Sequence, residues 1–191
     1  GGVLGAGTMG RGIAQVAAQA GHEVRLRDVK KDIVDHALGL VRAALEKGVQ
    51  LGKVSASDRD ATLSRIHGVT DLASATKDAH WIIEAVPEDL ALKQRVLREA
   101  ESHAAPDATL ATNTSSLSIA SIADGLARPQ RFLGLHFFNP PHLLKLLEVP
   151  RAYGDLLQAR VHRVELLAHE DAPEYEQDPE REQEREQHGF H

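Results

Sequence analysis

The feature that most restricts the fold of this chain is a glycine-rich turn near its start, GAGTMG at residues 5–10. It stands between a short apolar stretch and a segment whose apolar residues recur at helical spacing. A GxGxxG turn in this setting is typical of the first strand–turn–helix unit of a dinucleotide-binding sheet. Gly5 would allow the tight turn, Gly7 would let a pyrophosphate approach the backbone, and Gly10 would let helix and strand pack closely.

An acidic residue follows the turn at the distance that a dinucleotide site requires. The next alternating segment ends at Asp28, 18 residues beyond the last glycine of the motif. A carboxylate there can accept hydrogen bonds from a ribose 2′-hydroxyl and repels a 2′-phosphate. Helix-start amides, such as those of Thr8 and Met9, can bind phosphate. The sequence therefore predicts NAD as cofactor, while nearby Arg27 and Lys30 are the residues that would favour NADP.

Strand and helix signals alternate through the first 150 residues. Strands are expected at residues 3–4, 22–28, 81–86, 108–113, 131–138 and 143–149, and helices at residues 8–20, 30–48, 57–66, 90–104 and 116–126. This alternation predicts an α/β fold with a doubly wound, Rossmann-type and mostly parallel sheet. The two helices after the second strand would form an inserted hairpin. The ligand site of such a sheet lies at the carboxyl ends of its strands.

Composition and charge exclude several function classes. The chain has 22 basic and 28 acidic side chains, for a net charge of -6. A net negative charge does not favour binding to nucleic acid or to an anionic membrane. It has no cysteine, so a disulfide scaffold or thiolate metal site is impossible. No apolar run approaches the about 20 residues of a membrane span. We expect a cytoplasmic protein with no metal and no nucleic-acid or membrane partner.

The most informative polar residues follow the later strands. Ser115 lies just beyond the strand at 108–113, and His136 and Asn139 lie at the end of the strand at 131–138. Glu148 follows His136 by twelve residues, and a proline pair between them predicts that the chain doubles back. A His–Glu pair suits a general base that takes the proton of a secondary alcohol while its hydride departs. Ser115 and Asn139 could hydrogen-bond the same oxygen.

Four segments together resemble the 3-hydroxyacyl-CoA dehydrogenase family: GAGTMGRGIA, WIIEAVPEDLALK, NTSSLSI and GLHFFNPPHLLKLLEV. The resemblance covers residues 1 to about 149 and implies oxidation of an L-3-hydroxyacyl-CoA to the 3-oxoacyl-CoA, with NAD as hydride acceptor, as in fatty-acid β-oxidation. It implies that His136 is the catalytic histidine, Glu148 its partner, and Ser115 and Asn139 the hydroxyl and amide contacts. The cofactor contacts that it implies near the fourth strand are Ala85, Glu88, Lys93 and Asn113.

The resemblance also implies a CoA contact at the helical hairpin, with Lys47 and Lys53 as candidate residues. The family continues with a helical second domain of about 100 residues, the size of a small domain, which makes its dimer contact. Only 42 residues follow Val149 here, and they show a single apolar helical stripe. We therefore expect the C-terminal helical domain to be missing, as in a truncated gene or a tail read in another frame. The start at Gly1 likewise suggests a fragment boundary.

The chain is thus expected to divide into three parts. Residues 1–150 would form the NAD-binding and catalytic domain, and residues 151–169 a single helix or an irregular segment. Residues 170–191 would form a disordered tail, since residues 170–188 contain nine acidic side chains and two arginines.

Two other functions stay open at this stage. Carnitine or sugar-acid (gulonate) dehydrogenases share the histidine, the NPP turn and the glutamate, so the substrate could be a smaller 3-hydroxy acid. Alternatively, the chain could be a truncated NAD-binding module without catalytic activity, with an apolar surface left on its last strands.

Overall fold

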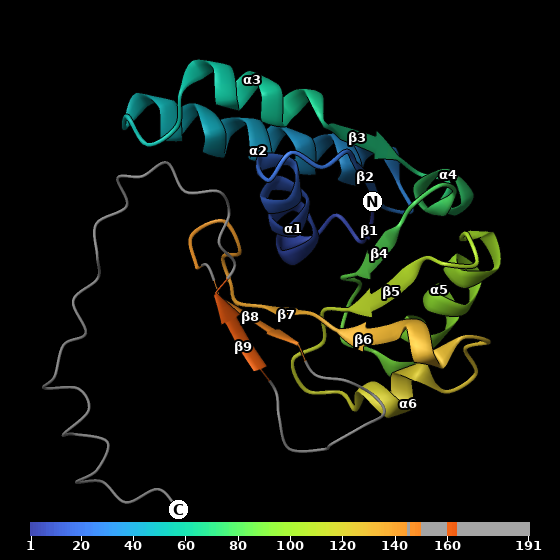
Figure 1. The fold of residues 1–191 in the computed structure, drawn as a ribbon. Helices are drawn as coiled ribbons and strands as arrows, with labels where there is room; N and C mark the ends of the chain where they lie inside the picture. The colour runs from blue at the N-terminus through green and yellow to red at the C-terminus, as the bar shows by residue number, and fades with distance from the viewer. Residues whose placement is uncertain (145, 150–159, 164–191) are drawn as a thin grey trace, which may run out of the picture.

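A computed structural model describes residues 1–144, 146–149 and 160–163 of the chain (Figure 1). The helices, in chain order, are α1 (Thr8–Gln19), α2 (Lys31–Gln50), α3 (Ala56–Ser64), α4 (Leu72–Thr76), α5 (Leu90–His103) and α6 (Ile119–Ala123), with a 3₁₀ turn at Pro129–Arg131. The strands are β1 (Gly2–Leu4), β2 (Val24–Arg27), β3 (Ile66–Val69), β4 (Trp81–Glu84), β5 (Thr109–Thr112), β6 (Phe132–Gly134), β7 (His136–Phe137), β8 (Leu146–Val149) and β9 (Arg160–Arg163).

Six strands form a parallel sheet in the order β3-β2-β1-β4-β5-β6. The chain moves outward from β1 in one direction to β3 and then returns to build the other half from β4. This reversal places a crevice beside the carboxyl ends of β1 and β4, where doubly wound sheets bind their ligands. A second, antiparallel sheet in the order β7-β8-β9 lies beyond β6 (Figure 1).

Helices cover both faces of the parallel sheet. Because successive strand residues point to opposite faces, neighbouring residues of one strand pack into two different clusters. Val3 and Ile83 belong to the cluster that packs against α1 and α2. Their neighbours Leu4 and Ile82 belong to the cluster that packs against α4, α5 and α6. The short apolar runs of the sequence are therefore explained by helices on both sides of each central strand.

The structure confirms the predicted fold class, including the hairpin of α2 and α3 inserted after β2. It corrects the end of that hairpin. Ile66, which the three-residue spacing from Leu63 placed on a helix, is the first residue of β3. The tight packing of Gly68, where an added Cβ would lie 2.5 Å from Val34 Cγ1, shows why this strand lies flat on α2. The short helix α4 was also not predicted.

The strand expected at residues 131–138 is two strands. β6 pairs with β5 in the parallel sheet, and the amide of Leu135 makes the last bond to that strand, at Thr112 O (2.9 Å). From His136 onward the chain pairs with β8 instead. A continuous apolar run does not reveal such a change of partner, because both segments are strands.

The structure describes four residues of the C-terminal segment, and the division of the chain into three parts stays a prediction. Residues 160–163, within the segment expected to be one helix or irregular, form β9 and pair with β8. The rest of residues 151–169 and the acidic segment 170–191 lie outside the described residues. In the described part of the chain, no helix is long and apolar enough to cross a membrane.

Candidate active site

The glycine turn between β1 and α1 has the geometry of a phosphate cradle. Gly5 has a φ of +103°, which favours glycine, and an added Cβ would lie 2.6 Å from Ala85 O. A Cβ on Gly10 would lie 1.7 Å from Gly5 O, so helix and turn touch there. Above Gly7 there is open space, with no heavy atom within 4 Å of an added Cβ. No side chain caps the start of α1, so its first amides are free for an anion.

Asp28 lies at the end of β2 and also braces this turn. Its Oδ2 accepts a hydrogen bond from the amide of Ala6 (2.8 Å), and its Oδ1 accepts one from the amide of Val29 (2.7 Å). Each carboxylate oxygen keeps a second lone pair for a ribose hydroxyl. Arg27, which the sequence left as a possible phosphate partner, donates through Nε to Thr70 O (3.0 Å). Together the open space, the free amides and this carboxylate fit a dinucleotide.

The antiparallel sheet brings His136 and Glu148 together. The two residues are directly opposite each other in the register of β7 and β8, which puts their side chains on the same face. Nδ1 of His136 lies 2.9 Å from Oε2 of Glu148. An ionised carboxylate only accepts hydrogen bonds, so Nδ1 carries the proton and the neutral ring has its lone pair on Nε2. The ring also packs against Phe138, with centroids 5.0 Å apart.

A cleft of about 320 Å³ joins the histidine to the nucleotide turn. Its lining comes from four separate segments: Met9 after β1, Ala85, Val86 and Glu88 after β4, Asn113 and Ser115 after β5, and residues 136–139. The structure thus brings the imidazole, the hydroxyl of Ser115 and the amide of Asn139 to one cavity at the carboxyl ends of the strands. This is the arrangement expected of a site that acts on a bound hydroxyl group.

Two contacts set the position of the segment that contains His136. Oδ1 of Asn113 accepts a hydrogen bond from the amide of Phe137 (2.9 Å), which ties the end of β5 to β7. Pro141 packs on α1 at Gly12, where an added Cβ would lie 2.9 Å from the proline ring. Asn113 therefore lines the cleft and also holds the backbone of Phe137, the residue after His136. The sequence did not reveal either contact, because both join residues far apart in the chain.

Glu88, in the loop that follows β4, holds the loop that follows β5 by hydrogen bonds. One of its oxygens, Oε1, accepts from the hydroxyl of Thr114, from the amides of Ser115 (3.0 Å) and Ser116 (3.2 Å), and from the hydroxyl of Ser116 (3.2 Å). Partial burial alone would raise the pKa of Glu88. The hydrogen bonds from Thr114, Ser116 and Ser115 and the charge of Lys93 outweigh it and lower the pKa to about 2. The sequence indicated a cofactor contact for Glu88 but not this role.

The lowered pKa of Glu88 predicts a pH-dependent contribution to stability. Because the pKa falls from 4.5 to about 2 on folding, the carboxylate stabilises the folded state fully above pH 4.5. That contribution is lost as the pH falls toward about 2. We expect the difference in urea midpoint between the unmodified chain and Glu88→Gln to be largest above pH 4.5 and to shrink below it. A difference that stays constant down to the acid limit would contradict this assignment.

The remaining candidates lie in different environments. Lys93, expected as a cofactor contact, is fully buried, and its ammonium bonds to protein oxygens. Lys47 and Lys53 are exposed near the tip of the α2–α3 hairpin, and the amide of Lys53 bonds to Gly48 O. Among the described residues, no group of three or more histidine, aspartate or glutamate side chains is placed to hold a metal ion.

Known proteins resemble this chain in sequence and in fold. Residues 2–155 match the family model described as 3-hydroxyacyl-CoA dehydrogenase, NAD binding domain. A probable 3-hydroxybutyryl-CoA dehydrogenase of Deinococcus radiodurans is 40% identical over 152 residues, which is 80% of this chain and 54% of the relative. A 3-hydroxyadipyl-CoA dehydrogenase of Escherichia coli is 42% identical over 147 residues, which is 77% of this chain and 31% of the relative.

The crystal structure of FadB2 from Mycobacterium tuberculosis superposes with a TM-score of 0.75 at 42% identity, covering 78% of this chain and 52% of that one. The chain therefore spans about half the length, or less, of the relatives that it matches. The family model covers most of the chain. The glycine turn and the cleft also fit a dinucleotide. The chain belongs to the 3-hydroxyacyl-CoA dehydrogenase family and contains its NAD-binding domain.

Proposed function

We propose that the protein oxidises the 3-hydroxyl of an L-3-hydroxyacyl-CoA to a ketone. The observation that supports this most is the imidazole of His136, oriented by Glu148, in the same cleft as Ser115 and Asn139. Relatives named for 3-hydroxybutyryl-CoA and 3-hydroxyadipyl-CoA suggest the thioester substrate class.

The proposed chemistry assigns one task to each side chain. Nε2 of His136 takes the hydroxyl proton as a general base, and Glu148 stabilises the imidazolium that forms. Ser115 and Asn139 donate hydrogen bonds to the substrate oxygen, which gains negative charge as the proton leaves. NAD, when bound, accepts the hydride from the carbon that bears the hydroxyl. The proton and the hydride together account for the two hydrogens that the alcohol loses.

The proposed cofactor contacts group at the carboxyl ends of β1, β2, β4 and β5: Gly5, Gly7, Thr8, Met9, Gly10, Asp28, Ala85, Glu88 and Asn113. Lys47 and Lys53 stay candidate CoA contacts on the hairpin. A cytoplasmic location also stays a prediction.

An NADH absorbance assay on the purified chain tests the proposal. We expect turnover of L-3-hydroxybutyryl-CoA with NAD and little or none of carnitine or gulonate. Preferential oxidation of carnitine or gulonate would show that the same site residues act on a smaller hydroxy acid and not on an acyl-CoA. NADH binding without turnover of any of the three substrates would indicate a non-catalytic module and contradict the proposal.

Replacing Asp28 with asparagine is expected to weaken the preference for NAD. The amide oxygen can still accept from Ala6, but the negative charge that repels a 2′-phosphate is gone. We expect the affinity for NADPH relative to NADH to rise by about tenfold or more, since about 1.4 kcal/mol of lost repulsion corresponds to that factor. Fluorescence titrations with both nucleotides measure it.

Asp32→Asn is the matched control, because Asp32 is an exposed carboxylate in the first turn of α2, four residues further along. It should leave both affinities unchanged. If Asp28→Asn and Asp32→Asn give the same nucleotide preference, Asp28 does not select the cofactor.

A further inference from the structure

The aromatic ring of Phe138 lies against the imidazole of His136. The two ring centroids are 5.0 Å apart, and the ring planes are tilted by 44°. Both residues line the cleft of the candidate site. We propose that Phe138 is a positioning residue, which holds the imidazole in the orientation that directs Nδ1 to Glu148 and leaves Nε2 free. The geometric part of this inference is independent of the reaction, and its catalytic consequence rests on the proposed function.

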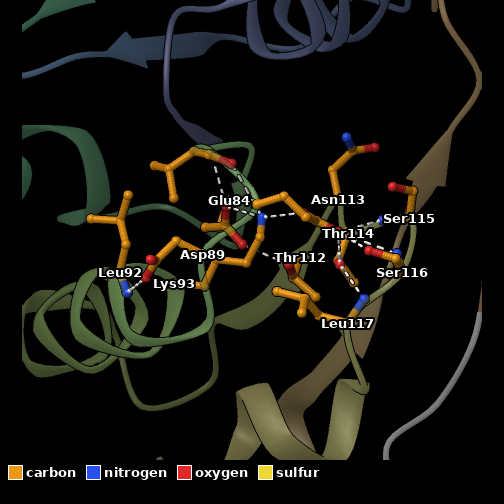
Figure 2. Close-up of polar contacts among 12 residues, drawn as sticks. Glu84, Asp89, Leu92, Lys93, Thr112, Asn113, Thr114, Ser115, Ser116 and Leu117 are labelled. Atoms are coloured by element: carbon orange, nitrogen blue, oxygen red, sulfur yellow. Dashed lines mark hydrogen bonds and ion pairs between the residues drawn. The ribbon is translucent and has the colours of Figure 1, made fainter.

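The backbone between the two rings is fixed by other contacts. The side chain of Phe137 is buried in the cluster that packs against α1 and α2, and its amide donates to Oδ1 of Asn113 (2.9 Å). Figure 2 shows the side chain of Asn113 pointing away from Lys93 and its partners. Because side chains alternate along a strand, His136 and Phe138 point to the side opposite Phe137. The rotation of the imidazole itself is not fixed by these contacts.

The hydrogen bond to Glu148 restricts this rotation only in part. The torsion that turns a histidine ring is broad and roughly two-fold, and a half turn would carry Nδ1 away from the carboxylate. The side chains of His136 and Glu148 are 24% and 35% exposed, so water can replace either partner of the bond. The ring of Phe138 occupies the space beside the imidazole through which the imidazole would turn. The two contacts together define one orientation.

This orientation matters for the proposed reaction. A general base must lie within hydrogen-bond reach of the proton that it takes, and a small misplacement lowers the rate by a large factor. The side chain of Phe138 is a hydrocarbon, so it takes no proton itself. Loss of its ring should therefore act through His136 and lower kcat more than it raises KM.

The test measures two properties of the full chain in each variant. The first is the rate at which the Nδ1 proton of His136 exchanges with solvent, followed by NMR. His136→Gln removes this signal and so assigns it among the eleven histidines. The second is the pair kcat and KM for L-3-hydroxybutyryl-CoA. Phe138→Leu removes the ring and keeps an apolar side chain, whereas Phe138→Tyr keeps the ring. Phe138 is only partly buried, so the fold should tolerate both changes.

Phe132→Leu is the matched control. Phe132 lies on β6 and is buried in the cluster that packs against α4, α5 and α6, on the other face of the sheet. The same ring is lost there, but from the protein core. We expect a lower urea midpoint for Phe132→Leu than for Phe138→Leu, with proton exchange at His136 as in the unmodified chain.

We expect exchange of the Nδ1 proton to accelerate by about tenfold or more in Phe138→Leu, because the imidazole leaves Glu148 more often. We expect kcat to fall about tenfold or more, while KM changes less than about threefold. Phe138→Tyr should restore most of the proton protection and most of kcat.

Equal exchange of the Nδ1 proton in Phe138→Leu and in the unmodified chain would overturn the inference, whatever the change in kcat. A loss of kcat without faster exchange would show that Phe138 acts on the substrate or the cofactor instead. Faster exchange in Phe132→Leu as well would reduce the effect to general destabilisation and also overturn the inference. If the unmodified chain turns over no acyl-CoA, the proposed function fails, yet the exchange experiment still decides whether Phe138 holds the imidazole.

Discussion

Replacing His136 with glutamine is expected to lower kcat for 3-hydroxybutyryl-CoA oxidation by about 10²–10⁴-fold, the usual contribution of a positioned general base. Glutamine can still bond to Glu148, but its amide nitrogen has no lone pair that can accept a proton. The dissociation constant of NADH should stay close to that of the unmodified chain, because the nucleotide turn and Asp28 are untouched. Steady-state kinetics and a fluorescence titration measure the two effects.

His103→Gln is a suitable control, because His103 is exposed at the end of α5. Its kinetics should match those of the unmodified chain. Activity in His136→Gln above about one tenth of the original would show that another group takes the proton, since a lost general base costs at least about 10²-fold. A parallel loss of NADH binding would instead point to a distorted cleft.

Gly10→Ala is expected to destabilise the fold, whereas Gly7→Ala is expected to leave its stability unchanged. A Cβ on Gly10 would lie 1.7 Å from the backbone oxygen of Gly5, so β1 and α1 must separate. Forced overpacking usually costs about 1–3 kcal/mol, and a clash with backbone places this case at or above the upper end. A Cβ on Gly7 meets no protein atom and needs no positive φ, so the free energy of unfolding should stay within about 0.5 kcal/mol.

The same two variants separate folding from binding. Gly7→Ala should weaken NADH binding about tenfold or more, because the methyl group occupies the space that the pyrophosphate needs. Urea unfolding and NADH titration measure both properties. Equal stability of the two variants would contradict the packing argument, and unchanged NADH binding by Gly7→Ala would remove the turn from the cofactor site.

The sequence predicted the architecture because its signals are local and agree with one another. A glycine turn between strand and helix patterns, repeated apolar runs and the spacing to Asp28 all point to one parallel sheet. Where the signal was shared by two elements, the prediction failed. Ile66 fits a helix or a strand equally well, and only pairing with β2 places it in β3.

Tertiary structure decided how the candidate site is built. The sequence indicated that His136 and Glu148 flank a turn, but the pairing of β7 with β8 makes them direct neighbours with Nδ1 and Oε2 2.9 Å apart. The sequence also did not reveal that Lys93 is buried between two carboxylates. A sequence specifies which residues follow each strand, because that order is local. Which oxygen each polar group meets depends on contacts between distant segments, and these exist only once the sheet has formed.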